Sequence, residues 1–506
     1  MLAAWSVIEI ILPVVLIGSG YSAWTMLESS IFLPFLYSRV RCCHEEGLPA
    51  QYDITSPEEM QLILDAAASL NLDVTTLDGK ISACAVPAFP PHFGEWSRSA
   101  KCVNKAYVQN EAQSLVGTYL PCQKVVAMIL MPVGGAIADV HGRRTVLQAY
   151  IFMCAIACAI FLIDCTQSMW GIGPVILAGM FISPCWEAKD TMLTCCIFDL
   201  SGTSWQTKIR GLSLFNVFCC ASLMAGYGLG FVVLCQHLTT YYWFWFAQLI
   251  AALGLLLTTS VFFGETLPAN FVRSVELRQL NPITASYDML SLVRKDWVLT
   301  FLLFHSFLFY MQKVGFLTQH FSYMQRVGFS TQEAVAPNIL GTIFEMGTTW
   351  VVSNTAGKVG CWKMMMGGQM CYVLSHIFWG PLLFTVGHGA PYIAWMFMGV
   401  GTAIWMPAIM AVMSDRVEEV HQAKIQAAWH WTNNIGIIAG AYIWNRYFWD
   451  ATGNGLGRIL PALGSLAVCT LNVSMLSVIQ TLVVDMRMKH SVPGSSCDSA
   501  DTRRSV

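Results

Sequence analysis

The sequence predicts an all-α membrane protein, with twelve transmembrane helices arranged in two pseudo-symmetric six-helix bundles. Three observations lead to this prediction. The chain of 506 residues is 55% hydrophobic and only 11% charged, whereas soluble domains carry about 25% charged residues. Twelve apolar stretches each approach or exceed the roughly 20 residues that a helix needs to cross a bilayer. Charged patterns in the first half of the chain also recur in the second half.

The apolar stretches divide the chain into consecutive parts. The first stretch lacks a basic start and is too long for the core of a signal peptide, so we expect it to remain as the first helix. We predict a first bundle over 1–263, which includes an extracytoplasmic loop at 38–110, and a second bundle over 297–485. A mixed-charge cytoplasmic linker at 264–296 joins them, and the polar tail at 486–506 is expected to be disordered. The expected helices are 5–36, 113–138, 145–165, 172–198, 211–235, 241–263, 297–320, 333–353, 364–386, 391–414, 425–447 and 459–484.

The distribution of lysine and arginine predicts the orientation in the membrane. Sixteen of them fall in the short loops, linker and tail on one side, and only Arg326, Arg446 and Arg458 fall in the short loops on the other. The positive-inside rule therefore predicts that both termini are cytoplasmic. We expect an integral, multi-pass protein of the plasma membrane rather than of an endolysosomal membrane. A net charge of −2 provides no basic surface for nucleic acid.

A spaced pair of charges repeats between the halves. Asp199 precedes Lys208 by nine residues before the fifth expected helix, and Asp415 precedes Lys424 by nine residues before the eleventh. Two equivalent halves are common in secondary transporters, which hold substrate near the midplane between them.

The loop after the second expected helix reads GGAIADVHGRR, and a weaker copy, NTAGKVGCWK, follows the eighth. The first loop matches the signature G-x-x-x-D-x-x-G-R-[KR], so the chain resembles the major facilitator superfamily. That resemblance implies that the loop latches the two bundles on the inner side in one state and releases them in another. The matching residues are Gly135, Asp139, Gly142, Arg143 and Arg144.

Each signature residue has a physical role to expect. Gly135 lets the helix end approach a neighbouring helix, and Gly142 suits a tight turn with positive φ. Asp139 can accept hydrogen bonds from a neighbouring helix N-terminus, where the dipole favours an anion. Arg143 and Arg144 lie at the anionic cytoplasmic surface. The alternative is that both arginines are only positive-inside anchors.

A closer similarity is to the proton-coupled folate transporter family, at VFFGETLP (261–268), HQAKIQAAW (421–429) and IWNRYFWDAT (443–452). The tetracycline-type proton antiporters share the signature loop and are similar in part. Phe215 and Met410 stand where the folate family has a proton-linked glutamate and an arginine, so the resemblance is to the scaffold more than to folate as substrate.

Ionisable residues within the expected helices are the best indicators of transport chemistry, because a charge at a helix centre costs about 2.5–3.5 kcal/mol on insertion scales. Carboxylates and histidines in a cavity can exchange protons, and lysines can bind an anionic group. The alternative is that these ionisable residues pair with one another and only hold the helices together. A cluster of aromatics and amides near the start of the eleventh helix could line a cavity. The candidates for substrate or proton binding are Lys124, Glu187, Lys189, Asp190, His305, Lys313, Glu345 and Asn434.

Two of these candidates are expected to meet. His305 lies nine residues from the cytoplasmic start of the seventh helix, near 296, and Glu345 lies ten residues from the end of the eighth, near 355. Equal depth would allow these two side chains to pair.

Together these features predict a secondary active transporter that moves a small organic solute by alternating access, with proton symport. Three embedded lysines favour an anionic solute. The alternatives are a proton-coupled drug or metabolite antiporter and, in another class, a non-transporting sensor or partner-binding protein that uses the large outer loop. The sequence shows no catalytic, metal-ligand or phosphate-binding spacing, so we expect neither an enzyme nor a cofactor.

Overall fold

The computed structural model describes residues 105–167, 173–201, 205–235, 240–267, 271–326, 336–382, 386–445 and 460–490. The first expected helix, 5–36, nearly all of the loop at 38–110 and most of the tail at 486–506 lie outside the described residues.

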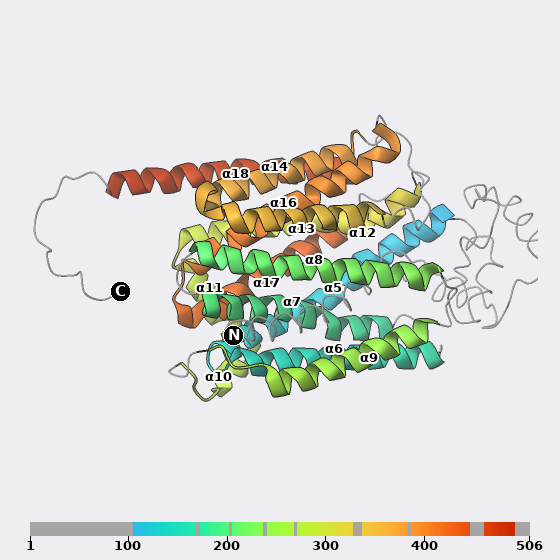
Figure 1. The fold of residues 1–506 in the computed structure, drawn as a ribbon, viewed down its shortest axis with the longest axis horizontal. Coiled ribbons are helices and arrows are strands. Elements are labelled where there is room, and N and C mark those ends of the chain that lie inside the picture. Colours follow the sequence, from blue (N-terminus) through green and yellow to red (C-terminus); the bar gives the residue numbers. More distant parts are fainter. Residues whose placement is uncertain are drawn as a thin grey trace, which may run out of the picture.

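Every expected helix after the first has a counterpart in the described part of the chain, and these helices run side by side along the long axis (Figure 1). Seven of the described helices are long and apolar enough to cross a membrane. In chain order the long helices are α5 (Lys105–Ala138), α6 (Arg143–Gln167), α7 (Gly173–Ser201), α8 (Trp205–Cys235), α9 (Thr240–Phe262), α12 (Trp297–Arg326), α13 (Ala336–Val359), α14 (Cys361–Trp379), α16 (Ala390–Ser414), α17 (Gln422–Ile443) and α18 (Leu460–His490).

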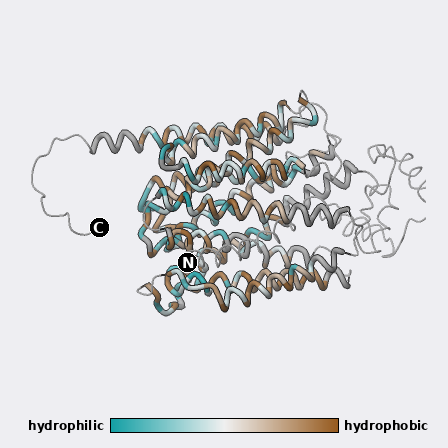
Figure 2. The backbone as a smooth tube through the Cα atoms, in the orientation of Figure 1, coloured by the Kyte–Doolittle hydropathy of each residue, from teal (hydrophilic) through white to brown (hydrophobic). Residues whose placement is uncertain are grey.

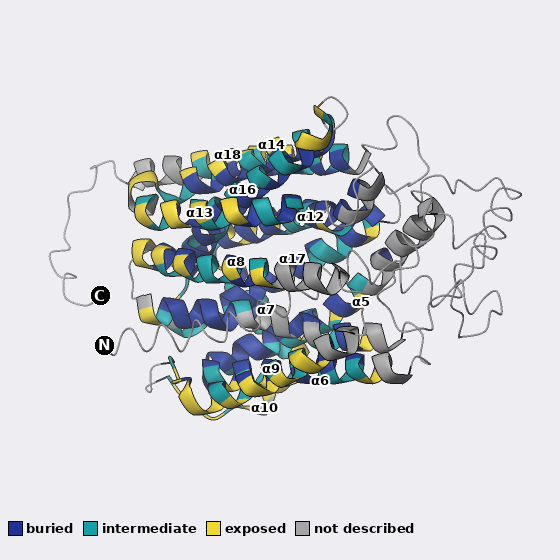
Figure 3. Cartoon of the chain, turned by 45° about the vertical axis from the view of Figure 1, so that its right-hand side comes forward, coloured by how far each residue is buried: buried dark blue, intermediate teal, exposed yellow. Residues whose placement is uncertain are grey.

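The exterior of the helices is apolar, as a lipid-facing surface requires. Large hydrophobic side chains such as Leu257, Val261 and Trp350 are more than half exposed. Hydrophobic residues run along most of the length of the described helices (Figure 2), while buried residues concentrate where helices face each other (Figure 3). Because helices satisfy their own backbone hydrogen bonds, they can span lipid without unpaired polar groups.

The helices form two bundles that meet along two seams. In the first bundle, α6 packs against α7 and α9, and α5 packs against α7. In the second, α12 packs against α17 and α18, and α16 packs against α13 and α14. The seams between the bundles are α5 against α17 and α8 against α13.

The region between the bundles contains two short helices, α10 (Leu277–Leu280) and α11 (Pro282–Arg294). Asn281 caps α11 by accepting a hydrogen bond from the amide of Ile283, and Pro282 suits the first turn. α11 packs against α5, α12 and α17. We call this end of the molecule, where α10 and α11 lie, the linker end.

The repeat seen in the sequence extends to the backbone. Gly142, between α5 and α6, has φ of 125°, and Gly360, between α13 and α14, has φ of 82°. Both turns need a backbone conformation that residues with a Cβ rarely adopt. The two signature loops therefore turn the chain at equivalent places in the two bundles.

Candidate functional site

At the linker end, Asp139 joins the first bundle to the second. Its Oδ1 accepts a hydrogen bond from the amide of Ala423 at 2.9 Å, and its Oδ2 accepts one from the amide of Lys424 at 3.0 Å. These amides belong to the first turn of α17, as the sequence predicted for a carboxylate at a helix N-terminus. The helices approach closely here because a Cβ on Gly135 would lie 2.8 Å from the Cβ of Ala427.

Arg143 supports Asp139 from within the first bundle. Its guanidinium donates to Asp139 Oδ1 at 2.8 Å and lies 3.5 Å from Asp199 Oδ2, and its side chain is fully buried. Thr266 donates a further hydrogen bond to Asp199 at 3.0 Å. Burial raises the pKa of the Asp139 carboxyl, against the opposing effects of Arg143 and the α17 amides, and burial likewise raises the pKa of Asp199. Arg143 is thus a buried structural partner as well as a positive charge at the membrane surface.

The turn at Gly142 is held by Glu265, which follows α9. Glu265 Oε1 accepts from the amide of Arg143 at 2.9 Å, and Oε2 accepts from the amide of Arg144 at 3.1 Å. A Cβ on Gly142 would collide with this carboxylate. The half-buried Arg144 side chain donates to the carbonyl of Ser260.

A second polar link joins the bundles at the linker end. Lys208 Nζ lies 2.9 Å from Asp415 Oδ1 and donates to Ser414 Oγ at 3.1 Å. Through these contacts the two bundles are closed against each other at the linker end in this conformation.

The thiol of Cys361, at the start of α14, also interacts with Asp415. Burial, together with this carboxylate, raises the pKa of the Cys361 thiol to about 11.

A polar cluster bridges the seam between α8 and α13 in the interior. Asn216 of α8 donates to Glu345 Oε1 of α13 at 3.1 Å and is 3.2 Å from Thr349 Oγ1. Cys220, also on α8, is a further hydrogen-bond partner of Glu345. Lys313 of α12 interacts electrostatically with Glu345 and lies over the ring of Phe309 at 5.6 Å. We call Asn216, Lys313 and Glu345 the interface cluster.

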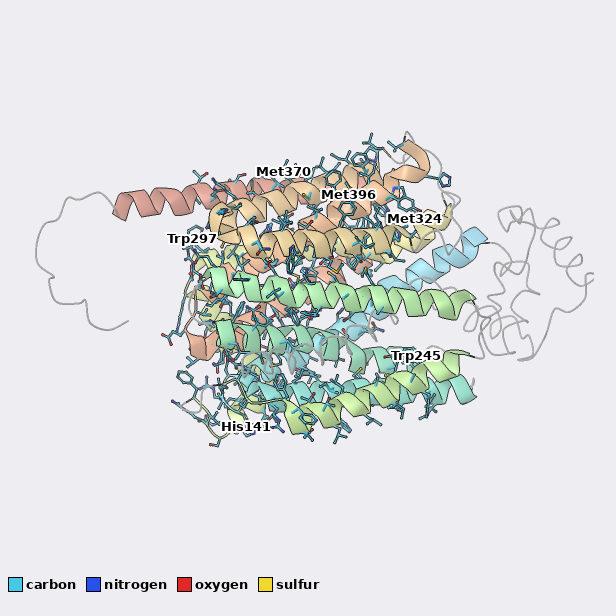
Figure 4. The ribbon with its side chains drawn as sticks, in the orientation of Figure 1. His141, Trp245, Trp297, Met324, Met370 and Met396 are labelled. Carbon is cyan, nitrogen blue, oxygen red and sulfur yellow. The ribbon has the colours of Figure 1, made fainter. Side chains whose placement is uncertain are left out.

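The structure corrects the expected pairing of His305 with Glu345. α12 runs from Trp297 at the linker end toward Met324 near the opposite end (Figure 4). Lys313 lies 16 residues after Trp297 and Glu345 lies 14 residues before Val359, where α13 ends, so these two share a depth. His305 lies only 8 residues after Trp297. The sequence placed the end of the eighth helix too early, and Lys313 takes the position expected for His305.

His305 instead belongs to the core of the second bundle. Its Nε2 accepts a hydrogen bond from the indole of Trp405 at 2.9 Å, and the ring is fully buried.

The other candidates lie on three helices that pack against one another, α5, α7 and α17. Lys124 is buried in α5, Asp190 is half-buried in α7, and Asn434 is buried in α17. The side chains of Glu187 and Lys189 lie outside the described ones.

Sequence reasoning missed Asn216, Glu265 and the contact between Lys208 and Asp415. Asn216 carries no charge, so a search for ionisable groups passes over it, although a single amide within an apolar run is itself a signal. The Asp–Lys repeat singled out Lys208 in the first half and Asp415 in the second, as members of two equivalent pairs, but could not show that these two residues meet across the bundles.

The signature loop, its contact with the opposite bundle and the duplicated bundles agree with the results of sequence comparison. A family model of the Major Facilitator Superfamily matches residues 83–441. The chain belongs to the major facilitator superfamily. It is therefore an integral, multi-pass membrane protein with a transporter fold. No curated protein sequence matches the chain.

Solved structures of transporters share the fold of this superfamily member. The human organic anion transporter MFSD10 (TETRAN) has a TM-score of 0.64 and 14% identity, over 94% of this chain and 99% of that one. A D-xylose-proton symporter has a TM-score of 0.57 and 13% identity, over 92% and 97%. A variant of the nucleoside transporter NupG has a TM-score of 0.56 and 10% identity, over 93% and 98%. At these identities the similarity is one of fold.

Proposed function

We propose that the protein is a secondary active transporter that moves a small organic anion together with protons by alternating access. The observation that carries the proposal is the interface cluster. Glu345 of the second bundle accepts a hydrogen bond from Asn216 of the first at the seam between α8 and α13, and Lys313 of the second bundle interacts electrostatically with Glu345. Charged groups within apolar helices are costly, and the position of these two at the seam between the bundles is the reason we assign them a function in transport.

The cluster can couple the two fluxes through the charge of Glu345. An ionised Glu345 neutralises Lys313 and accepts the hydrogen bond of Asn216. A proton on Glu345 removes the attraction to Lys313, which is then free to bind the anionic group of a solute. Proton and anion would therefore bind together and leave together.

The linker end would be the inner gate. The hydrogen bonds of Asp139 to α17 and the Lys208–Asp415 pair close it in this conformation. Release of these contacts would open the interface cluster to the cytoplasm. We further propose that both termini are cytoplasmic and that the protein lies in the plasma membrane. The first bundle would comprise 1–263, the linker 264–296 and the second bundle 297–485. The scaffold would be related to that of the proton-coupled folate transporters.

Uptake into liposomes tests the proposal. Purified protein is reconstituted, and labelled organic anions, nucleosides and xylose are offered with an inward proton gradient. We expect accumulation of an organic anion by the wild type. Glu345→Gln should lose the response to the gradient yet keep solute exchange, because Gln can still accept from Asn216. Glu276→Gln, the same change at an exposed position in the linker, is the control. Gradient-driven uptake that persists in Glu345→Gln would contradict the assignment.

The same assay separates symport from the alternative directions of transport. Symport predicts accumulation with an inward proton gradient, whereas a proton-coupled antiporter predicts loss of preloaded solute. A protein that binds these solutes but moves none of them would favour the sensor alternative.

A further inference from the structure

A column of polar side chains runs inside the second bundle, away from the interface cluster. Three helices each contribute two members spaced seven residues apart, which is nearly two turns, so each pair shares one face of its helix. Each of these side chains belongs to a residue with 0% exposure. We call this set the amide–histidine column. Its members are His305 and Gln312 of α12, Gln369 and His376 of α14, and Ser465 and Asn472 of α18.

Contacts between the three helices bring the column together. Gln369 Nε2 lies 3.5 Å from His305 Nε2, and Asn472 lies beside the His305 ring. Ser465 donates to the backbone carbonyl of Gln312 at 3.5 Å. Cys469, between the two α18 members, contacts the carbonyl oxygen of Gln369 at 3.9 Å.

Many polar atoms of the column have no hydrogen-bond partner in the described part of the chain. They include both amide atoms of Gln312 and both ring nitrogens of His376. Such groups are rarely left unsatisfied in a folded protein, because their burial without a partner is strongly unfavourable.

The chemistry of these atoms indicates what satisfies them. A side-chain amide presents a donor and an acceptor together. A metal cation would satisfy acceptors only, and an anion would satisfy donors only. Water both donates and accepts, and buried waters typically bridge several polar groups of this kind.

The first bundle offers an internal reference for the same position in the fold. Alignment of Gly142 with Gly360 places Ile151 at the position of Gln369 and Cys158 at that of His376. Ile151 and Cys158 are buried as well, at 1% and 3% exposure. The fold is therefore compatible with apolar side chains at these two positions, and of the two helices compared only α14 places polar side chains there.

We propose that the amide–histidine column is a binding site for ordered water molecules within the second bundle, separate from the proposed transport site. Gln312 and Lys313 are consecutive residues of α12, so this one helix contributes both to the amide–histidine column and to the interface cluster. The site does not depend on which solute is carried or on proton coupling.

Radiolytic labelling of the full-length wild type in ¹⁸O-water tests the site directly. Hydroxyl radicals that form from bound water label adjacent side chains even where bulk solvent does not reach. Cys469, which lies beside the column, and Cys158, in the first bundle, are both nearly fully buried. We expect several-fold more label on Cys469 than on Cys158. Equal labelling of the two cysteines would overturn the proposal.

Substitution of one amide provides a second test with opposite expectations. If Gln312 contacts water, Gln312→Met removes hydrogen bonds and the melting temperature falls. If Gln312 is dry and unsatisfied, the same change removes an unfavourable group, and the melting temperature is unchanged or rises. Gln319→Met, one heptad further along the same face, sets the scale for the loss of one known hydrogen bond, because Gln319 Nε2 donates to the carbonyl of Trp444 at 2.8 Å while its Oε1 has no partner among the described residues. An unchanged or higher melting temperature for Gln312→Met would overturn the proposal. If the variant does not fold, the labelling of the wild type decides.

Discussion

At the scale of single residues, Asp139 shows how a short side chain can hold two bundles together. One carboxylate accepts from two amides of α17 and from Arg143. The carboxylate complements the helix dipole, and charge-assisted hydrogen bonds of this kind are stronger than neutral ones.

We expect Asp139→Asn to favour the open state of the linker end. The amide can accept through only one of its two atoms, so at least one α17 amide loses its acceptor and Arg143 loses the opposite charge beside it, which is worth about 1–3 kcal/mol. Distances between spin labels on the linker-end loops of the two bundles would measure the shift in population. Arg144→Gln, at a half-buried position whose hydrogen bonds go to Glu265 and Ser260 rather than to Asp139 or α17, is the control. An unchanged distance distribution in Asp139→Asn would rule out this latch.

Lys313 and Glu345, which are both half-buried and interact electrostatically, make a second prediction at this scale. Lys313→Met removes the charge that offsets the Glu345 carboxylate and should lower the melting temperature, because a charge within the helices is unfavourable without an opposite charge nearby. The double variant Lys313→Met/Glu345→Gln removes both charges and should recover most of that stability. Thermal unfolding in detergent would measure both variants. A double variant that is no more stable than Lys313→Met would show that the two charges do not compensate each other.

The site residues differ in how far the sequence could predict them. The turn at Gly142 was predictable because a positive φ is a local requirement of the backbone. The acceptor role of Asp139 at a helix N-terminus was expected from the charge of its carboxylate, but which helix it contacts was not. Asn216 was not predicted as a site residue because the search considered ionisable side chains and Asn216 carries no charge. The pairing of His305 with Glu345 was wrong because depth in the membrane depends on helix ends, and hydropathy locates an end only to within several residues.

At the scale of elements, the apolar stretches predicted the described helices well, since the thickness of a bilayer fixes the length of a span. The ends were less predictable. α13 continues to Val359, six residues past the expected end at 353, because polar side chains at its end do not prevent helical hydrogen bonding. Helix α10 is a single turn and carries no periodic signal, whereas α11 buries Ala285, Met289 and Val293 at helical spacing after an Asn281–Pro282 start, a pattern that a search for membrane-spanning stretches passes over.

The two glycine turns give a matched prediction for helix starts. Gly142→Ala combines an unfavourable φ with a collision against Glu265, whereas Gly360→Ala meets no atom within 4 Å. Both should be destabilised by about 1–2 kcal/mol from the backbone alone, and Gly142→Ala should lose more. Melting temperatures of the two variants would provide the comparison. Equal losses would mean that Glu265 moves aside freely.

At the scale of the whole molecule, the linker end depends on contacts that cross between the bundles. Local sequence patterns could not predict them, because the relative placement of two bundles is set by packing over whole helices. The Lys208–Asp415 pair is the clearest case.

Charge exchange tests that pair. Lys208→Asp and Asp415→Lys each place like charges opposite each other and should favour the open linker end. The combination Lys208→Asp/Asp415→Lys restores attraction and should return the closed population toward that of the wild type. Spin-label distances across the linker end would follow all three variants. If the combination behaves like the sum of the single changes, the pair does not hold the bundles.

The positive φ of Gly360 shows that the second signature loop kept the turn of the first. Its chemistry did not persist, since Gly357 and Cys361 stand where Asp139 and Arg143 stand in the first loop. Only the first of the two loops therefore carries the carboxylate that joins the bundles. A single acquired defect at Asp139 has no backup copy in the other half, so tolerance to mutation should be far lower in one loop than in its twin.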